Sequence, residues 1–307
     1  MTRCLICDGA DTACELNVRD YITGQIFALQ RCPACGFMFT WPQPGNLDGF
    51  YPRSYRAYGP AILALFRVVH RRRVRSWTRA RGAVGRALEI GCGHGWMLAA
   101  LREAGWQTVG LERTVESGRH ARTTLGLDVR IGELDVFGAG EQFDLIIMNQ
   151  VLEHLADPMP RLRACAKLLK PGGWLIIGVP NLDSWQFHFV RQHWVHLDVP
   201  RHLGHFTRAA LRAALKRAGL RMTEIRTTNF EYDPFGWPQA ILNALGVEQN
   251  LLLSWLTGQK RNRLYTPVGW MAVLLTVLLA VPSLLLSVAS WLAGAGAIME
   301  VRAVRSD

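Results

Sequence analysis

The stretch RALEIGCGHGW, residues 86–96, decides the fold, because a short apolar run opens there into three glycines at alternate positions. A strand is expected over 87–90, and the glycines let the backbone turn tightly and approach a ligand that a Cβ would block. The helix that follows offers N–H groups to an anion. The next apolar run ends in Glu112, 112 − 91 = 21 residues beyond the first glycine, where a carboxylate can accept hydrogen bonds from ribose hydroxyls. The sequence therefore predicts a site for a nucleoside cofactor.

The spacing of the glycines distinguishes between two such cofactors. A dinucleotide fingerprint, GxGxxG, needs its third glycine at position 96, which is Trp96. The spacing present, GxGxG, favours S-adenosylmethionine (AdoMet) over NAD. Glu89 either caps the loop at the strand end or places its carboxylate near the methionine part of AdoMet. Cys92 and His94 are expected to contribute backbone contacts.

Short apolar runs alternate with helical stretches beyond the turn. Strands are expected at residues 108–111, 143–148 and 174–179, and helices at 96–104, 159–170 and 207–218. Thr207 is a plausible N-cap of the last helix, and Gly219 ends it. Strand and helix alternating at this spacing predict an α/β fold, a doubly wound parallel sheet with right-handed crossovers.

Four further motifs extend this interpretation. They are Gly110-Leu111-Glu112, Gly132-Glu133-Leu134-Asp135, the segment from Asn149 to Pro158 and the segment from Leu168 to Gly173. Together with the glycine turn, they make residues 86–232 resemble the class I methyltransferases, in the subgroup related to ubiquinone-type O-methyltransferases. The resemblance implies a Rossmann-like, mostly parallel seven-stranded sheet. It also implies cofactor contacts from Glu89, Gly91, Cys92, Gly93, Gly95, Glu112, Glu133, Leu134, Asn149 and Gln150, with Glu133 or Asp135 at the adenine amino group.

The N-terminus carries two CxxC pairs, which supply Cys4, Cys7, Cys32 and Cys35. Four thiolates satisfy tetrahedral Zn²⁺, and a closed shell of four ligands is typical of a structural site. Seven cysteines with this spacing favour metal ligation in a reducing compartment, with an iron centre or a redox pair as alternatives. The pattern resembles the zinc ribbons fused to bacterial methyltransferases of polysaccharide and secondary-metabolite pathways, and Tyr51, Tyr55 and Tyr58 fit it.

Candidate catalytic bases cluster in two places. A base is needed when the methyl acceptor is a poor nucleophile such as a hydroxyl. Glu153 and His154 follow the fourth expected strand, and the segment after the fifth carries His193, His196, His202 and His205. We take Glu153, His154, His202 and His205 as candidates; His202 and His205 alternatively cap the next helix or bond the backbone. Arg201 either holds an acidic substrate group or pairs with Asp198.

The C-terminal part contains a long apolar stretch, residues 268–293, with no charged residue between Arg263 and Glu300. It is long enough to cross a bilayer, but Pro282 is expected to divide it into two short halves. Residues 297–304 should form the last strand of the sheet, so the chain must leave and return on one side. We therefore expect a helical hairpin or in-plane element in the cytoplasmic leaflet, with Lys260, Arg261 and Arg263 near anionic headgroups. A buried cap or a dimer interface is the alternative.

Five segments follow from these observations. They are a zinc ribbon (1–45), a basic helical linker (46–82), an AdoMet-binding core (83–235), an apolar helical insertion (236–296) and the last strand (297–307).

The expected function is methyl transfer, most simply O-methylation, to a small-molecule, sugar or lipid-linked acceptor near the cytoplasmic membrane. The net charge of +11 favours an anionic partner, so an RNA methyltransferase is one alternative. Nucleic acid is less expected as partner, because no Asn-Pro-Pro-Tyr or Pro-Cys signature occurs. A non-catalytic scaffold is the other alternative, and we see no secretory signal. A peripheral or monotopic location at the inner face of that membrane is expected, and the oligomeric state is not readable.

Overall fold

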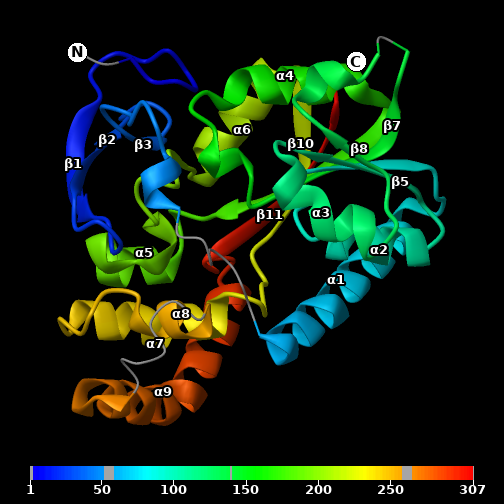
Figure 1. Cartoon of the computed structure of the whole chain (residues 1–307). Helices are drawn as coiled ribbons and strands as arrows, with labels where there is room; N and C mark the ends of the chain where they lie inside the picture. Colours follow the sequence, from blue (N-terminus) through cyan, green and yellow to red (C-terminus); the bar gives the residue numbers. More distant parts are fainter. Residues whose placement is uncertain (1–2, 52–58, 139, 258–264, 307) are drawn as a thin grey trace.

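The computed structural model describes residues 3–51, 59–138, 140–257 and 265–306, and its centre is a seven-stranded sheet with helices on both faces (Figure 1). Its strands are β4 (Arg86–Ile90), β5 (Gln107–Glu112), β6 (Val129–Ile131), β7 (Phe143–Asn149), β8 (Leu169–Pro180), β10 (Leu220–Arg226) and β11 (Ile298–Arg305). The order is β10-β11-β8-β7-β4-β5-β6. Only β11 runs antiparallel to its neighbours β8 and β10, while the other pairs are parallel. The expected doubly wound, mostly parallel sheet is confirmed.

Alternate side chains of the central strands build two separate cores, because successive residues of a strand point to opposite faces. Leu88 and Ile146 pack with helices α4 and α6, whereas Ala87 and Leu145 pack with α1 and α2. The helices around the sheet are α1 (Pro60–Arg81), α2 (Trp96–Glu103), α3 (Val115–Thr123), α4 (Pro158–Leu168), α5 (Trp185–Val190) and α6 (Arg208–Arg217). Thr207 caps α6 through its side chain, as expected.

The N-terminal unit forms its own small sheet, which is completed by the core. This sheet has the order β1-β2-β3-β9, with β1 (Ala13–Arg19), β2 (Ile26–Arg31), β3 (Met38–Thr40) and β9 (Gly204–His205). Met38 pairs with His205 and Phe39 with Gly204. A Cβ on Gly204 would lie 2.8 Å from the Phe37 ring, so this close approach requires glycine. The histidine-rich segment after β8 is therefore held directly by the N-terminal unit.

The described residues between β10 and β11 form three helices: α7 (Asp233–Ala244), α8 (Leu251–Leu256) and α9 (Pro267–Leu292). They form a lobe at the edge of the molecule, and α9 packs along α7 (Figure 1). The expected division at Pro282 is wrong, because α9 is one 26-residue helix through it. A proline removes a single backbone hydrogen bond, and Pro282 lies on the exposed side of the helix. β11 then returns to the sheet at the expected place.

Five residues named from the sequence lie outside the described part of the chain. They are Tyr55, Tyr58, Lys260, Arg261 and Arg263.

Candidate active site

The glycine turn has the backbone conformation that the sequence predicts. Gly91, Gly93 and Gly95 have φ values of +69°, +48° and +80°, which favour glycine. A Cβ on Gly91 would lie 2.6 Å from Cγ2 of Val151. The turn therefore brings bare backbone to the carboxyl ends of β4 and β5, where open α/β sheets bind their ligands.

A cavity of about 550 Å³ lies over this turn. Its walls come from the carboxyl ends of four neighbouring strands, and they include Gly91, Gly93, His94, Glu112, Glu133, Gln150, Val151 and His154. Glu112 is anchored there, since Oε2 accepts a hydrogen bond from Gly93 N (2.9 Å) and Oε1 accepts one from Arg113 N (3.0 Å). Each carboxylate oxygen has a second lone pair for a ribose hydroxyl.

Glu89 lies in β4, two residues before Gly91, and was expected near the methionine part of AdoMet. It is buried, and its Oε2 atom has no hydrogen-bond partner among the described residues. Burial raises the pKa of this carboxyl to about 8. A buried carboxyl of this kind can pair with an ammonium group, such as the one on the methionine part of AdoMet.

The remaining residues expected at the cofactor have different surroundings. Glu133 lines the cavity and forms an ion pair with Arg161. Asn149 Oδ1 accepts a hydrogen bond from Arg73 Nη2 (3.2 Å). Cys92 turns into the core next to Gly110, and burial raises the pKa of its thiol. The cavity walls do not include Glu89, Cys92, Gly95, Leu134, Asp135 or Asn149.

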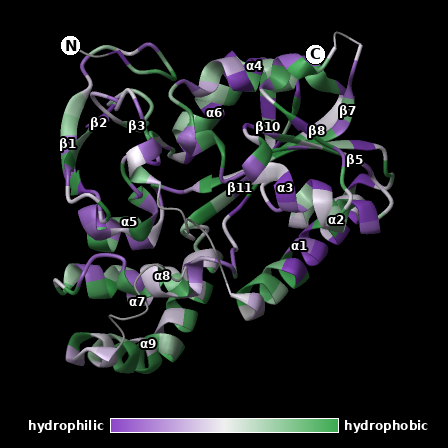
Figure 2. Cartoon of the chain, in the orientation of Figure 1, coloured by the Kyte–Doolittle hydropathy of each residue, from purple (hydrophilic) through white to green (hydrophobic). Residues whose placement is uncertain are grey.

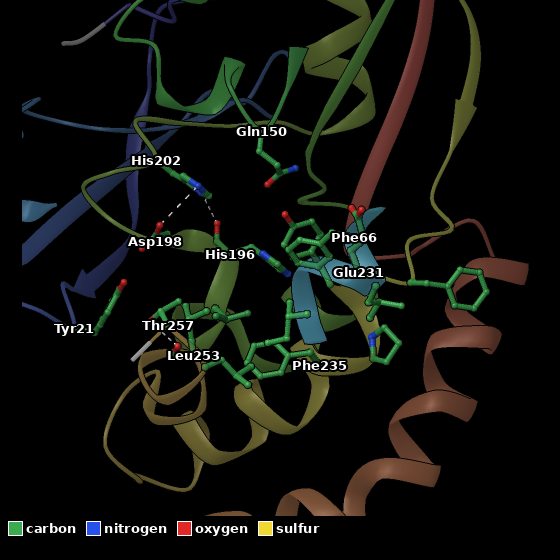
Figure 3. Close-up of a pocket in the computed structure, with 17 residues that line it drawn as sticks. Tyr21, Phe66, Gln150, His196, Asp198, His202, Glu231, Phe235, Leu253 and Thr257 are labelled. Atoms are coloured by element: carbon green, nitrogen blue, oxygen red, sulfur yellow. Dashed lines mark hydrogen bonds and ion pairs between the residues drawn. The ribbon is translucent and has the colours of Figure 1, made fainter. Parts of the chain in front are cut away.

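A second cavity, of about 330 Å³, adjoins the first (Figure 3). Gln150 lines both cavities, and its φ of +57° is unusual for a residue other than glycine. Three polar residues of the histidine-rich segment line the second cavity together with Gln150: His196, Asp198 and His202. Other polar lining residues lie elsewhere in its wall, namely Tyr21, Glu231, Tyr232 and Thr257. Apolar side chains from α1, α7 and α8 form much of the rest of the wall: Ile62, Leu65, Phe66, Phe235, Leu253 and Leu256. The cavity thus combines a polar group of residues, which includes the shared Gln150, with a large apolar wall.

Two candidate bases, His154 and His202, share one arrangement. Nδ1 of His154 lies 2.8 Å from the carbonyl oxygen of Arg201, and Nδ1 of His202 lies 2.8 Å from that of His196. Because a carbonyl only accepts, each Nδ1 carries a proton, so in the neutral ring the lone pair lies on Nε2. His154 lines the first cavity and His202 the second. Glu153, between them, is completely buried.

Two other candidates are placed differently. His205 lies on β9, lines neither cavity, and burial lowers its pKa to about 3. Arg201 is fully buried and pairs with Asp198 (Nε–Oδ1, 2.8 Å) and Asp20 (Nη2–Oδ1, 2.8 Å). Holding an acidic substrate group is therefore the wrong interpretation of Arg201, which ties the histidine segment to the N-terminal unit.

The four CxxC cysteines converge. The Sγ atoms of Cys4 and Cys35 are 3.6 Å apart, those of Cys7 and Cys32 are 3.5 Å apart, and all four lie within 4.8 Å of one another. A disulfide requires about 2.05 Å, whereas a tetrahedral zinc with sulfur at about 2.3 Å requires edges of roughly 3.8 Å. A hydrogen bond from Cys35 lowers the pKa of Cys4 to about 5. The cluster is compatible with a zinc ribbon, and Cys14 is exposed outside it.

Sequence reasoning missed most of the second cavity. The cavity residues that were missed come from the N-terminal unit, α1, and the segment that leads from β10 into α7: Tyr21, Phe66, Glu231, Tyr232 and Phe235. Apolar residues on helices carry no signal that separates a cavity wall from a core.

Comparisons with known proteins identify the family of the chain. A family profile described as a methyltransferase domain matches residues 62–225, more than half of the chain. A ubiquinone biosynthesis O-methyltransferase from Bordetella avium is 33% identical over 164 residues, which are 48% of this chain and 66% of that protein. One from Cereibacter sphaeroides is 28% identical over 190 residues, 58% of this chain and 74% of that protein. The first alignment thus spans just under two thirds of the relative.

Among solved structures, a proposed sarcosine dimethylglycine methyltransferase from Galdieria sulphuraria superposes with a TM-score of 0.52. It is 15% identical, with 81% of this chain and 92% of that chain covered, so it supports the fold alone. The fold is that of the class I methyltransferases. The chain belongs to the methyltransferase-domain family, and family, relatives and fold together indicate an AdoMet-dependent methyltransferase.

Proposed function

We propose that this protein transfers the methyl group of AdoMet to a hydroxyl oxygen of an amphiphilic small-molecule, glycan or lipid-linked acceptor at the cytoplasmic face of a membrane. The observation that carries this proposal is the position of Gln150 in the wall between the two cavities. The first cavity suits AdoMet, and the second suits an acceptor with a polar and an apolar end. The relatives named for O-methylation support oxygen as the methylated atom.

The polar end of the acceptor cavity would hold and deprotonate the hydroxyl. His202 lines that end, His154 lines the adjoining first cavity, and one carboxyl oxygen of Glu153 lies within 4.8 Å of a ring nitrogen of each. Bound AdoMet supplies a methyl group that leaves its sulfur as the acceptor oxygen bonds to it, so the products are a methyl ether, S-adenosylhomocysteine and a proton. Positioning in a cavity shielded from water is the main contribution of the chain.

The role of Glu89 in this proposal can be tested by measuring the protons released when AdoMet binds. The Glu89 carboxyl, with a pKa of about 8, is protonated in the free protein between about pH 6 and pH 7. The ammonium group of AdoMet favours its charged form, so binding should release close to one proton, and affinity should rise with pH towards 8. Calorimetry in buffers of different ionisation enthalpy measures this release. The Glu89→Gln variant should release none, and equal release by both proteins would contradict the role of Glu89.

The four thiols would hold a structural Zn²⁺ in the N-terminal segment. We keep the division of the chain into the five segments outlined from the sequence. Support comes from the spacing of Cys4, Cys7, Cys32 and Cys35. Because β3 pairs with β9, the zinc would stabilise the segment that carries His202.

Membrane association rests on α9, the single helix in the described part of the chain that is long and apolar enough to cross a membrane. Figure 2 shows it as mostly hydrophobic. Small buried residues face the protein, among them Ala272, Ser283 and Ser287, whereas Val277, Leu278, Val281 and Leu285 are more than 60% exposed. Because α9 lies along α7, we infer that it rests in the plane of the cytoplasmic leaflet.

The acceptor cavity adjoins this helix. Phe230 lines the cavity, and its ring lies 4.5 Å from that of Trp291 on α9 (centroid to centroid). Exposed Arg72, Arg75 and Arg79 on α1 supply positive charge for anionic headgroups. An acceptor anchored in the leaflet would therefore reach the cavity without crossing water.

Glutamate at either of two exposed positions of α9 should weaken the association with the membrane. Each of Leu278→Glu and Leu285→Glu loses about 1.5–3 kcal/mol of apolar burial, and vesicle binding should weaken about tenfold or more for each. Sedimentation with anionic vesicles measures it. Val84→Glu, at another exposed apolar position, serves as control. If the wild-type protein stays in the supernatant and is a dimer, the result would contradict membrane binding. It would favour the alternative that α9 forms a dimer interface.

The methylation proposal is tested with methyl-labelled AdoMet. Purified protein is incubated with a membrane lipid extract, a soluble metabolite extract or total RNA from the source cells. Label in an ether-linked methyl group of the lipid or metabolite fraction supports the proposal. Label in RNA alone would instead favour the RNA methyltransferase alternative.

A further inference from the structure

A third cavity, of about 500 Å³, is lined by α1, by the end of β10 and the residues after it, and by β11. Three arginines line it, Arg72, Arg73 and Arg226, whereas Glu300 is the one acidic residue among its described lining residues. Apolar side chains form much of the rest of the wall: Leu65, Val68, Val69, Trp77, Phe230 and Ile298. The cavity therefore suits a ligand that has a negative group and a hydrocarbon part.

Glu300 does not make this cavity acidic, because donors of α1 occupy both of its carboxylate oxygens. Arg73 Nη2 donates to Oε2 (2.6 Å), and Trp77 Nε1 donates to Oε1 (3.0 Å). Arg73 also lies beside Glu231 (Nη1–Oε2, 3.7 Å). The charge of Arg73 is thus used within the protein, and the capacity to hold an anion depends on the other two arginines.

These two arginines, Arg72 and Arg226, carry more positive charge than the neighbouring carboxylates neutralise. Arg72 is exposed and forms no ion pair with a described residue. Arg226 pairs with Glu224 (Nε–Oε1, 2.5 Å), but the second oxygen of Glu224 pairs with Arg302 (Nη2–Oε2, 2.8 Å). One carboxylate therefore serves two guanidinium groups, and none among the described residues serves Arg72.

Ser76 places Arg72 and Arg226 near each other. It follows Arg72 by four residues, one turn of α1, so both project from the same face of the helix, and its Oγ lies 3.5 Å from Nη1 of Arg226. Asn229 adds a neutral donor to the wall, since its Oδ1 accepts hydrogen bonds from two backbone N–H groups (3.0 and 2.9 Å) and its Nδ2 is left to donate.

This set of donors matches a phosphate group. Arginine forks bind phosphate through paired N–H groups. A phosphate ester has three terminal oxygens, enough for both forks, whereas a carboxylate has two.

The apolar part of the wall connects these arginines with the acceptor cavity and with α9. Leu65 and Phe230 line both the second and the third cavity. Leu65 and Val68 are 51% and 45% exposed, and the Phe230 ring lies against that of Trp291 on α9. A ligand that occupies both cavities would therefore pass over apolar side chains next to the helix that we place in the leaflet.

We propose that the third cavity binds a phosphate group of the acceptor, which is therefore a phosphate-bearing amphiphile. Arg72 and Arg226 would hold the phosphate, while the hydroxyl part of the acceptor enters the second cavity. This inference rests on the proposed function, and it selects the phosphorylated lipid-linked class among the acceptors considered there. The phosphate is bound and not transferred, so the methylation step is unchanged.

Dodecyl phosphate below its critical micelle concentration is the probe, and calorimetry with the full-length protein measures its binding. We expect one dodecyl phosphate per chain, bound at least about tenfold more tightly than inorganic phosphate or dodecyl maltoside. Arg72→Gln and Arg226→Gln should each weaken this binding about tenfold or more, because each loses charge-assisted hydrogen bonds. Arg212→Gln is the matched control, since Arg212 is exposed on α6, on the other face of the sheet, and lines none of the three cavities.

Both arginines are exposed, so the variants should fold, and circular dichroism checks this. Equal binding of dodecyl phosphate by the wild-type protein and both variants would overturn the site. Inorganic phosphate bound as tightly as dodecyl phosphate would overturn the amphiphile and favour a soluble phosphorylated ligand.

Competition separates an acceptor site from a contact with membrane phospholipid. In the methylation assay with the membrane lipid extract, dodecyl phosphate should inhibit competitively with the extract and not with AdoMet. Tight binding without inhibition would overturn the assignment to the acceptor. Methylation confined to phosphate-free acceptors would also overturn it and leave the proposed function intact. Binding that needs both arginines, in a protein that methylates nothing, would retain the phosphate site and refute the proposed function.

Discussion

Replacing Glu112 with alanine is expected to reduce affinity for AdoMet about 100-fold or more. The variant loses the carboxylate that would accept two ribose hydrogen bonds, each worth about 1.5–3 kcal/mol when one partner is charged. It also removes the acceptor for Gly93 N, which holds the turn in shape. Equilibrium binding by calorimetry measures the change.

A matched control is available in the same cavity. Glu116 also lines it, but lies on the exposed first turn of α3 and pairs with Arg119. Glu116→Ala should bind AdoMet within a few-fold of the wild-type protein. Equal losses in both variants would mean that general negative charge, not the ribose contact, explains the effect.

Replacing Cys32 with serine is expected to release the zinc and reduce methylation at least about tenfold, although Cys32 touches neither cavity. The physical reason is the shared sheet. β3 pairs with β9, and Thr207 Oγ1 donates to the carbonyl of Cys35 (3.0 Å), so loss of the ribbon loosens the segment carrying His202. Zinc content per chain, thermal unfolding and methylation rate are measured together.

Cys14→Ser provides the comparison, since Cys14 is exposed and lies outside the cluster. It should keep one zinc per chain and full activity. A zinc-free Cys32→Ser protein with wild-type activity would show that the N-terminal unit does not support the acceptor site.

The features predicted correctly from the sequence depend on local signals. The glycine turn, the strand ending in Glu112 and the Thr207 cap each follow from residues within a few positions of one another. The last strand was predictable because it is a short alternating segment after a long helical one. The family resemblance implied a mostly parallel sheet, and the structure shows that β11 is the antiparallel strand.

Features that were missed depend on contacts between distant segments. β9 has only two residues, too few for a periodic signal, yet it joins the N-terminal unit to the core. Arg201 reaches Asp20 across the same junction, which no spacing rule reveals. The second cavity gathers side chains from six separate segments of the chain. The predicted break at Pro282 was wrong because a proline inside a long apolar helix need not end the helix.

Titration of AdoMet into the wild-type protein, with Gly91→Val alongside, tests the central claim most directly. A valine at position 91 would place its Cβ 2.6 Å from Val151 in a backbone conformation that favours glycine. We predict one AdoMet bound per wild-type chain and no measurable binding to a folded Gly91→Val variant. Absence of binding to the wild-type protein, or equal binding to both, would contradict the assignment of the glycine turn as the cofactor site.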